Sequence, residues 1–269
     1  MPLAVCATPI GNLDDVSLRV LDELREADLL LCEDTRRTRI LLDRHGISAR
    51  LVSYHRHNEA ARERDVLDAL ARGERVALVS DAGLPGVNDP GARLIEAALS
   101  AGQQVTVLPG ASAVETALVA SGLVGDRYQF VGYLPRRRGE REALAEDLAR
   151  WPHTVVAFES PRRLPESLAL LARAMPDRAA AVCRELTKRF EEVRRGTLEE
   201  LAAQFAEPPR GEITVVLGSF TPAGGAAREE VALQAVAELV AAGAPRRTAA
   251  DIVARLTGSS RNALYRSSL

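Results

Sequence analysis

The feature that most constrains the fold is a repeated alternation of short apolar runs with amphipathic helical patterns, which continues for about the first 218 residues. Such an alternation is typical of a mostly parallel sheet covered by helices. In the first half, strands are predicted at 3–6, 29–32, 75–80 and 104–108, with helices near 16–27, 36–45, 58–72 and 90–101. Residues 1–121 are therefore expected to form an N-terminal α/β domain.

A second α/β series follows residues 123–127, which lack periodicity and are expected to be a linker. Strands are predicted at 129–132, 153–158, 179–184 and 212–218, with helices near 139–150, 161–174 and 197–206. Residues 122–220 are therefore expected to form a C-terminal α/β domain. Two such units in tandem leave a cleft between them, which is the usual place for a small-molecule site.

Several helix ends carry recognisable signals. Asp89 and Pro90 are predicted to start the helix near 90–101 in the N-cap and N1 positions. Residues 160–161, Ser-Pro, are a second predicted helix start, and Thr197 with Glu200 forms a capping-box pattern. These signals support the division of the chain into strands and helices.

The composition changes after Phe220. Residues 221–227 have the composition of a flexible joint, and 228–243 indicate one helix with Val231 and Val236 on its apolar face. Two short helical patterns then flank residues 257–259, with helix-turn-helix-like spacing. Residues 221–269 are thus a predicted helical extension. Its last part, 243–269, carries five arginines and one aspartate, and both a solvated helical cap and an RNA-contacting appendage fit it.

Composition and charge limit the expected partners, compartment and metal content of the protein. The formal net charge of -2 gives no global signal for a nucleic-acid partner, so RNA contacts would come from local arginine clusters such as 135–141. Three widely spaced cysteines favour a reducing compartment, and no apolar run approaches a membrane span, so a cytoplasmic protein with no membrane partner is expected. His55 and His57 lack ligand partners at zinc spacing, and no metal site is predicted.

The segments whose side chains could bind a ligand or take part in a reaction follow predicted strands, where ligands of parallel sheets bind. Residues 7–13 form a turn after the first strand and offer Asn12, but they lack the G-x-G-x-x-G pattern of a Rossmann cofactor site. This disfavours an NAD-dependent dehydrogenase and the commonest class of methyltransferase. After the second strand come Glu33, Asp34 and Arg36; Asp34 fits a helix cap, whereas a cap requires neither of the others.

A loop at 79–91 with three glycines and two prolines is the most informative segment. Gly83 and Gly86 permit close backbone approach to a ligand, and Asp81 can bind a cationic or hydroxyl group. The loop has no P-loop lysine, which disfavours a polyphosphate ligand. A further turn at 109–113 opens a helix. Segments 158–163, 184–188 and 211–214 occupy comparable strand ends in the second half, where they are expected to form a second wall of the cleft between the two domains.

Seven segments in one order resemble a known family: TPIGNL at 8–13, CEDTRRT at 32–38, SDAGLPGVNDPG at 80–91, PGASA at 109–113, ESPRR at 159–163, RELTK at 184–188 and GE at 211–212. They resemble the tetrapyrrole methylase superfamily of S-adenosylmethionine enzymes. Within it they are similar to the branch that methylates the ribose 2′-oxygen of a cytidine in small-subunit ribosomal RNA. The resemblance covers essentially the whole chain, including NALY at 262–265.

This resemblance implies a homodimer of two-domain subunits, with S-adenosylmethionine folded into the interdomain cleft, and small ribosomal subunit RNA as the partner. Carried over residue by residue, the cofactor contacts would be Pro9, Asp81, Gly83, Val87, Ser112 and Ala113, together with Phe158, Leu186 and Ile213 on the second wall. Many of these contacts would use backbone atoms.

A ribose hydroxyl is a poor nucleophile until its proton leaves, so a carboxylate within hydrogen-bond reach would help as a base or an orienting acceptor. Glu33, Asp34 and Asp81 are the candidates, and the sequence does not rank them. Asn12 and Arg36 are expected to position the nucleotide. Glu159 and Lys188 are further candidates from the second domain, and no metal is required.

Two alternatives stay open. One is methylation of a tetrapyrrole carbon or of the modified histidine of a translation factor, although the 32–38 segment and the basic tail argue against both. The other is a non-catalytic RNA-binding or assembly protein that keeps the fold. Composition by itself does not distinguish methylation of a ribose from methylation of a base.

Overall fold

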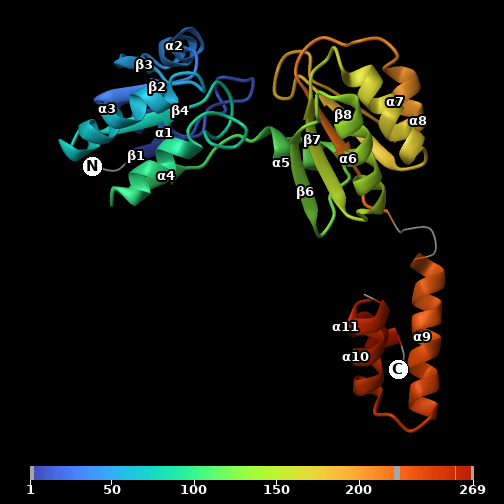
Figure 1. The fold of residues 1–269 in the computed structure, drawn as a ribbon. Helices are drawn as coiled ribbons and strands as arrows, with labels where there is room; N and C mark the ends of the chain where they lie inside the picture. The colour runs from blue at the N-terminus through green and yellow to red at the C-terminus, as the bar shows by residue number, and fades with distance from the viewer. Residues whose placement is uncertain (1–2, 221–224, 258, 268–269) are drawn as a thin grey trace.

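The structure, a computed structural model, describes residues 3–220, 225–257 and 259–267. Its strands form two five-stranded sheets within these ranges, and three helices at the C-terminal end pack together (Figure 1). The α/β class with two tandem units and a helical extension is confirmed. None of the helices in the described ranges has the length and apolar character that crossing a membrane requires.

The first sheet is parallel throughout and has the order β3-β2-β4-β1-β5. Its strands are β1 (Leu3–Cys6), β2 (Leu29–Cys32), β3 (Leu51–Ser53), β4 (Val76–Val79) and β5 (Val105–Leu108), and its helices are α1 (Leu18–Glu26), α2 (Thr35–Arg44), α3 (Glu59–Ala71) and α4 (Ala92–Ser100). The three central strands are buried on both faces, which explains their continuous apolar runs.

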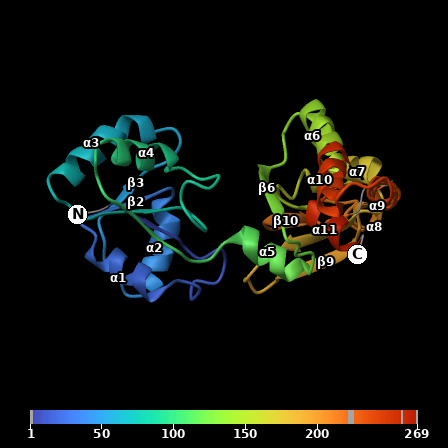
Figure 2. The same cartoon turned by 90° about the horizontal axis from the view of Figure 1, so that it is seen from below.

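Helices cover both faces of this sheet, with α1 and α2 on one side and α3 and α4 on the other (Figure 2). Side chains alternate between the two cores along each strand, so Cys6 packs with α1 and α2 while Val5 packs with α3 and α4. The β1, β2 and β4 strands end at one edge, where their following loops gather. This edge holds the segments that the sequence singled out.

The second sheet is mixed, with the order β6-β7-β10-β8-β9, and only β6 and β7 are parallel. Its strands are β6 (Tyr128–Tyr133), β7 (Thr154–Glu159), β8 (Ala179–Arg184), β9 (Glu192–Thr197) and β10 (Ile213–Leu217), and its helices are α6 (Arg138–Arg150), α7 (Leu164–Ala174) and α8 (Leu198–Gln204). The prediction of a mostly parallel sheet is therefore wrong for this half. A short connection folds β9 back along β8, and β10 inserts antiparallel between β7 and β8.

Helix α5 (Ala113–Ser121) packs on the second sheet, although we expected residues up to 121 to belong to the first domain. Its side chains Val114, Ala117 and Leu118 share one apolar cluster with Val156 and Val216 of that sheet. The chain thus crosses between the two sheets in the segment that precedes α5. This crossing places residues 109–113 between the two units.

Local signals were right in some places and wrong in others. Thr197 and Glu200 form the predicted capping box of α8. By contrast, α4 begins at Ala92 after Gly91, whose φ of 127° ends the preceding loop, and not at Pro90. Likewise, α7 begins at Leu164, three residues beyond the predicted start at 160–161.

The helical extension has a small core of its own. It consists of α9 (Gly225–Ala241), α10 (Arg246–Thr257) and α11 (Arg261–Ser267), with Ala232, Val236, Ala249, Ala250, Val253 and Leu264 buried between them. Val231 is exposed, which corrects its expected place on the apolar face. Most of the expected joint at 221–227 and one residue of the turn, Gly258, lie outside the described residues.

Candidate functional site

A cavity of about 940 Å³ lies between the two sheets and is lined from both domains. The first domain contributes the segments after β2, β4 and β5, and the second contributes residues near the ends of β6, β7, β8 and β10. The N-terminal turn of α5 closes one side of the cavity. Its volume lies in the range of small-molecule and cofactor sites.

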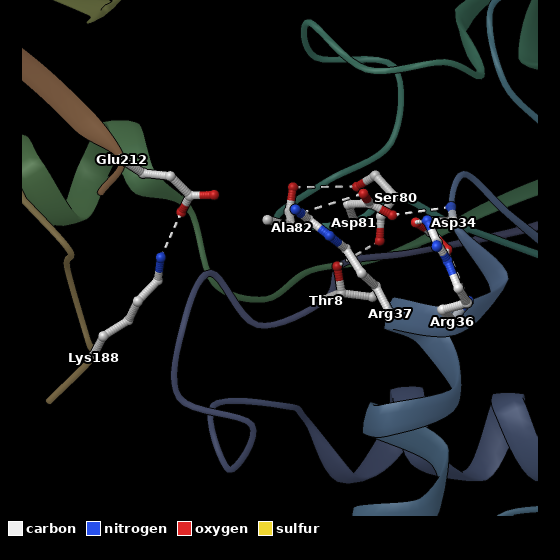
Figure 3. A network of polar contacts seen from close by, with 9 residues as sticks. All are labelled: Thr8, Asp34, Arg36, Arg37, Ser80, Asp81, Ala82, Lys188 and Glu212. Carbon is white, nitrogen blue, oxygen red and sulfur yellow. Dashed lines mark hydrogen bonds and ion pairs between the residues drawn. The ribbon is translucent and has the colours of Figure 1, made fainter. Parts of the chain in front are cut away.

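The glycine loop after β4 is fastened to the turn after β1. Thr8 and Gly83 exchange both backbone hydrogen bonds, with N–O distances of 2.8 and 3.0 Å, and the Thr8 hydroxyl donates to the Ser80 carbonyl at 3.0 Å (Figure 3). Gly83 has a φ of +77°, which other residues rarely adopt. A glycine here therefore lets the loop backbone form part of the cavity wall.

Three carboxylates line the first-domain side, and each has a raised pKa. Burial, together with the charge of Asp81, raises the pKa of Glu33. Burial also raises the pKa of Asp81, which accepts a hydrogen bond from the Asp34 backbone at 3.1 Å and faces Arg37 at 3.4 Å. Burial, and next the charge of Glu33, raises the pKa of Asp89 to about 6. Carboxylates held in this way suit a cationic ligand and proton transfer.

Asp34 differs from these three groups. It is the N-cap of α2, accepts from the Arg36 backbone at 2.8 Å and forms an ion pair with the Arg36 guanidinium at 2.8 Å (Figure 3). Hydrogen bonds from Arg36 lower the pKa of Asp34 to about 2. Neither residue lines the cavity. The structure therefore gives Asp34 a capping role.

The second-domain wall is apolar and aromatic. Phe158 packs edge-to-face with Phe130 and Tyr133, with ring centroids 4.9 and 5.5 Å apart, and Leu186 and Ile213 continue this wall. An aromatic wall facing carboxylates combines a stacking surface with negative charge. Such a cavity can hold a flat heterocycle at one side and a cation at the other.

Glu159 reaches this wall but is fully engaged inside the second domain. Its carboxylate accepts from the Ser160 backbone at 2.6 Å and from the Ser167 hydroxyl at 2.5 Å, and it pairs with Arg163 at 2.6 Å. Its side chain is fully buried. A network of this kind fixes the end of β7, so Glu159 positions the wall rather than offering a free group.

The structure gathers most of the predicted residues around one cavity. Those that line it are Glu33, Asp81, Gly83, Val87, Ser112, Ala113, Phe158, Leu186 and Ile213. Pro9 is buried in the adjoining turn, and Asn12 lines a separate open cavity of about 800 Å³ together with Lys188. Asp89 and Tyr133 also line the cavity, and their place there is not predictable from the sequence, because Asp89 matches a helix start and Tyr133 belongs to no motif.

The predicted arginine cluster at 135–141 is only partly available. Arg141 is buried and pairs with Glu166 at 2.7 Å, so it does not belong to the exposed surface. Arg137 and Arg138 are exposed and form ion pairs along α6. In the helical extension, Arg247 and Arg261 line a small cavity of about 260 Å³. Among the described residues, no group of three or more His, Cys, Asp or Glu side chains is arranged to hold a metal ion.

The chain belongs to the family of tetrapyrrole (corrin/porphyrin) methylases, whose family model matches residues 2–202. It is similar along almost its whole length to proteins named ribosomal RNA small subunit methyltransferase I. The relative from Mesorhizobium japonicum is 46% identical, covering 98% of this chain and 90% of the relative. The relative from Micromonospora olivasterospora is 43% identical, covering 98% and 85%.

Solved structures share the fold at lower identity. The methyltransferase CobJ matches with a TM-score of 0.62 at 23% identity, covering 82% of this chain and 95% of that protein. A diphthine synthase matches with a TM-score of 0.60 at 18% identity, covering 81% and 90%. A uroporphyrin-III C-methyltransferase from Thermus thermophilus, solved with S-adenosyl homocysteine, matches with a TM-score of 0.58 at 21% identity, covering 81% and 97%.

Proposed function

We propose that this protein is an S-adenosylmethionine-dependent methyltransferase that methylates the ribose 2′-oxygen of a cytidine in small-subunit ribosomal RNA. The observation that carries the proposal is the 46% identity over 98% of the chain to a protein named for methylation of that RNA. The interdomain cavity gives this activity a place, since it joins a carboxylate-lined wall to an aromatic one.

The cavity residues suit S-adenosylmethionine as the cofactor. The size of the cavity fits a nucleoside with an amino-acid tail, and the carboxylates that line it suit a sulfonium. The glycine loop and the first turn of α5 offer backbone groups to the ligand. When bound, this cofactor supplies a methyl group that is already activated on sulfur. We assign its contacts to Gly83, Val87, Ser112, Ala113, Phe158, Leu186 and Ile213, with Pro9 shaping the turn behind them.

We assign a different role in the reaction to each of two cavity carboxylates. Glu33 lines the cavity with a raised pKa and has no hydrogen-bond partner within the described residues, so it is our choice for the base that takes the hydroxyl proton. Asp81 is held by the Asp34 backbone and by Arg37, which suits an orienting acceptor. Asn12 and Arg36 lie outside the cavity and are proposed to contact the nucleotides that flank the target.

RNA contacts are assigned to exposed arginines. Residues 136–138 lie at the start of α6, and the extension at 221–269 adds the arginines of α10 and α11. From the expected units 1–121, 122–220 and 221–269 we propose to keep three units and the limit at 220, but to move the first limit. The packing of α5 on the second sheet favours placing the first limit near 110.

We also propose a cytoplasmic homodimer. Val107 on the edge strand β5 and Val119 on α5 are 51% and 70% exposed, so both apolar side chains are accessible to a partner. A second copy that covers them would bury this surface. Light scattering of the wild type and of Val119→Arg tests this point, with a shift toward the monomer as the expected result.

The alternatives predict different outcomes of one experiment. Calorimetric titration with S-adenosylmethionine is followed by tritium transfer to small ribosomal subunits that lack the modification. The proposal expects cofactor binding and transfer to the RNA. Binding without transfer to any RNA would favour a tetrapyrrole or modified-histidine substrate, and absence of cofactor binding would favour a non-catalytic RNA-binding protein.

A further inference from the structure

One residue type is almost absent from this chain. Among its 35 basic residues, 34 are arginines, and Lys188 is the single lysine. Arginine and lysine serve equally well at most exposed positions, so a chain that uses arginine everywhere else keeps lysine where arginine's shape or chemistry does not suit. The surroundings of Lys188 therefore deserve a functional explanation.

Lys188 lies between two carboxylates. Its Nζ atom is 2.8 Å from Glu185 Oε1. The same atom is 2.8 Å from Glu212 Oε2, and this second contact is drawn in Figure 3. An ammonium has three N–H donors, and these contacts use two of them. The third has no partner within the described residues. Glu212 lines the large cavity and Lys188 lines the open one, so this ion pair lies between the two cavities.

The loop that carries Lys188 is held in an unusual conformation. Glu185 and Thr187 have φ values of 53° and 64°, in the left-handed region that residues with a Cβ rarely adopt. The Thr187 hydroxyl accepts from the Asn12 backbone at 2.9 Å, and a Cβ on Gly11 would lie 2.5 Å from Lys188 Cγ. The first-domain turn therefore fits closely against this side chain. Backbone strain of this kind is retained where a position must be exact.

The charge state of Lys188 decides whether it acts as a hydrogen-bond donor or as a base. Burial acts to lower the pKa of Lys188, but the hydrogen bonds that Lys188 donates to Glu185 and Glu212 outweigh it and raise the pKa. The amine therefore stays protonated and serves as a donor, not as a base. A protonated amine attracts an oxygen that becomes negative. Lys188 lines the open cavity and not the interdomain one, so its position favours the methyl acceptor over the cofactor as its ligand.

We propose that the third N–H of Lys188 donates to the ribose 2′-oxygen of the target nucleotide, which makes Lys188 a catalytic residue. This inference rests on the proposed function. In the step, the oxygen–carbon bond forms as the carbon–sulfur bond breaks, with its electron pair staying on sulfur. The hydroxyl proton passes to a cavity carboxylate, for which Glu33 is our choice, while Lys188 keeps its protons and stabilises the negative charge that develops on oxygen.

The test compares Lys188→Met and Lys188→Arg with a matched control. Arg75 forms ion pairs with Glu23 and Glu26 and lines neither cavity, so Arg75→Lys makes the reverse exchange in another double ion pair. We expect both Lys188 variants to lower kcat for methyl transfer to small subunits by roughly 10- to 100-fold, with cofactor affinity unchanged. Arg75→Lys should transfer at the wild-type rate.

Each outcome has a defined meaning. A normal kcat in Lys188→Arg, or an effect confined to KM, would overturn the contact with the reacting oxygen. A parallel loss of cofactor affinity and thermal stability would indicate a structural role and overturn it as well. If the wild type transfers no methyl group to any ribosomal RNA, the proposed function fails instead.

A measurement on the unmodified chain covers the case in which the Lys188 variants do not fold. With one lysine, an amine acylating reagent has only Lys188 and the N-terminal amine to modify, and peptide mass spectrometry separates the two. We expect small subunits, added with S-adenosyl homocysteine, to protect Lys188 at least several-fold relative to the N-terminal amine. Equal modification with and without subunits would refute the contact.

Discussion

Cofactor affinity should fall as the pH is lowered from 7 to 5, because the carboxyl group of Asp89 becomes protonated in this interval. Its pKa is raised from 3.8 to about 6 by burial and next by the charge of Glu33. The ionised carboxylate attracts a sulfonium, and the neutral carboxyl does not. Binding of S-adenosylmethionine therefore favours the ionised form and lowers the pKa of Asp89 again.

The size of the effect follows from the pKa values. If the bound sulfonium returns the pKa of Asp89 to 3.8, linkage makes the affinity about tenfold weaker at pH 5 than at pH 7. The effect on folding has the opposite sign. Since the folded-state pKa is raised, the contribution of Asp89 to stability is present below 3.8 and is lost as the pH rises through about 6. The loss of affinity is therefore not acid unfolding caused by this group.

The assay is calorimetric titration at pH 5, 6 and 7 with S-adenosylmethionine and, separately, with S-adenosyl homocysteine, whose sulfur is neutral. The first ligand should show the tenfold loss and the second much less of it. Asp89→Asn should flatten the pH dependence of the affinity for S-adenosylmethionine. Glu63→Gln is the control and should not flatten it, because the Glu63 carboxylate pairs with Arg93 at 2.6 Å and lines neither cavity. An equal pH dependence for both ligands would refute the reasoning, because the sulfonium would then play no part.

Other predictions follow from the same site. Asp34→Ala should lower thermal stability modestly, because a helix cap is lost, with little change in turnover, whereas Asp81→Ala should lower the transfer rate by ~10²–10⁴. If the two variants have equal melting temperatures and equal transfer rates, Asp34 is not only a cap and Asp81 is not the catalytic group of the two. Gly83→Val should abolish cofactor binding, seen in titration, because valine disfavours a φ of +77°, while circular dichroism stays native; retained affinity would be contrary to the assigned wall. Deleting 221–269, or neutralising 136–138, should flatten the salt dependence of subunit binding by ~0.7–0.9 in log–log slope per lost phosphate contact; an unchanged slope would count against these RNA contacts.

The sequence predicts the buried elements of this fold much better than its exposed ones. Central strands such as β1 and β2 are continuous apolar runs, and their predicted limits agree with the structure. In contrast, β9 reads EVRRGT and lies at a sheet edge, where the charged side chains that protect an edge hide its pattern. Strand direction is also beyond periodicity, because an apolar run is the same in either orientation. The mixed order of the second sheet therefore needed the structure.

The same limits apply to the site. Loops after parallel strands meet at one edge, so the sequence could bring Glu33 and Asp81 together. For Asp34 the sequence left a capping role and a catalytic role open, and the structure shows that its carboxylate caps α2 and pairs with Arg36. The raised pKa of Asp89 depends on burial and on neighbours distant in sequence, which no local motif records. Long-range proximity is the physical information that the sequence pattern lacked.

Mapping the position of the transferred methyl group tests the proposed reaction. Small ribosomal subunits from cells with and without this protein are digested to nucleosides and analysed by mass spectrometry, with the purified chain and S-adenosylmethionine added to the unmodified subunits as a third sample. We expect that one 2′-O-methylated cytidine disappears without the protein and returns when it is added. A methyl group on a base, or an unchanged nucleoside profile in all three samples, would contradict it.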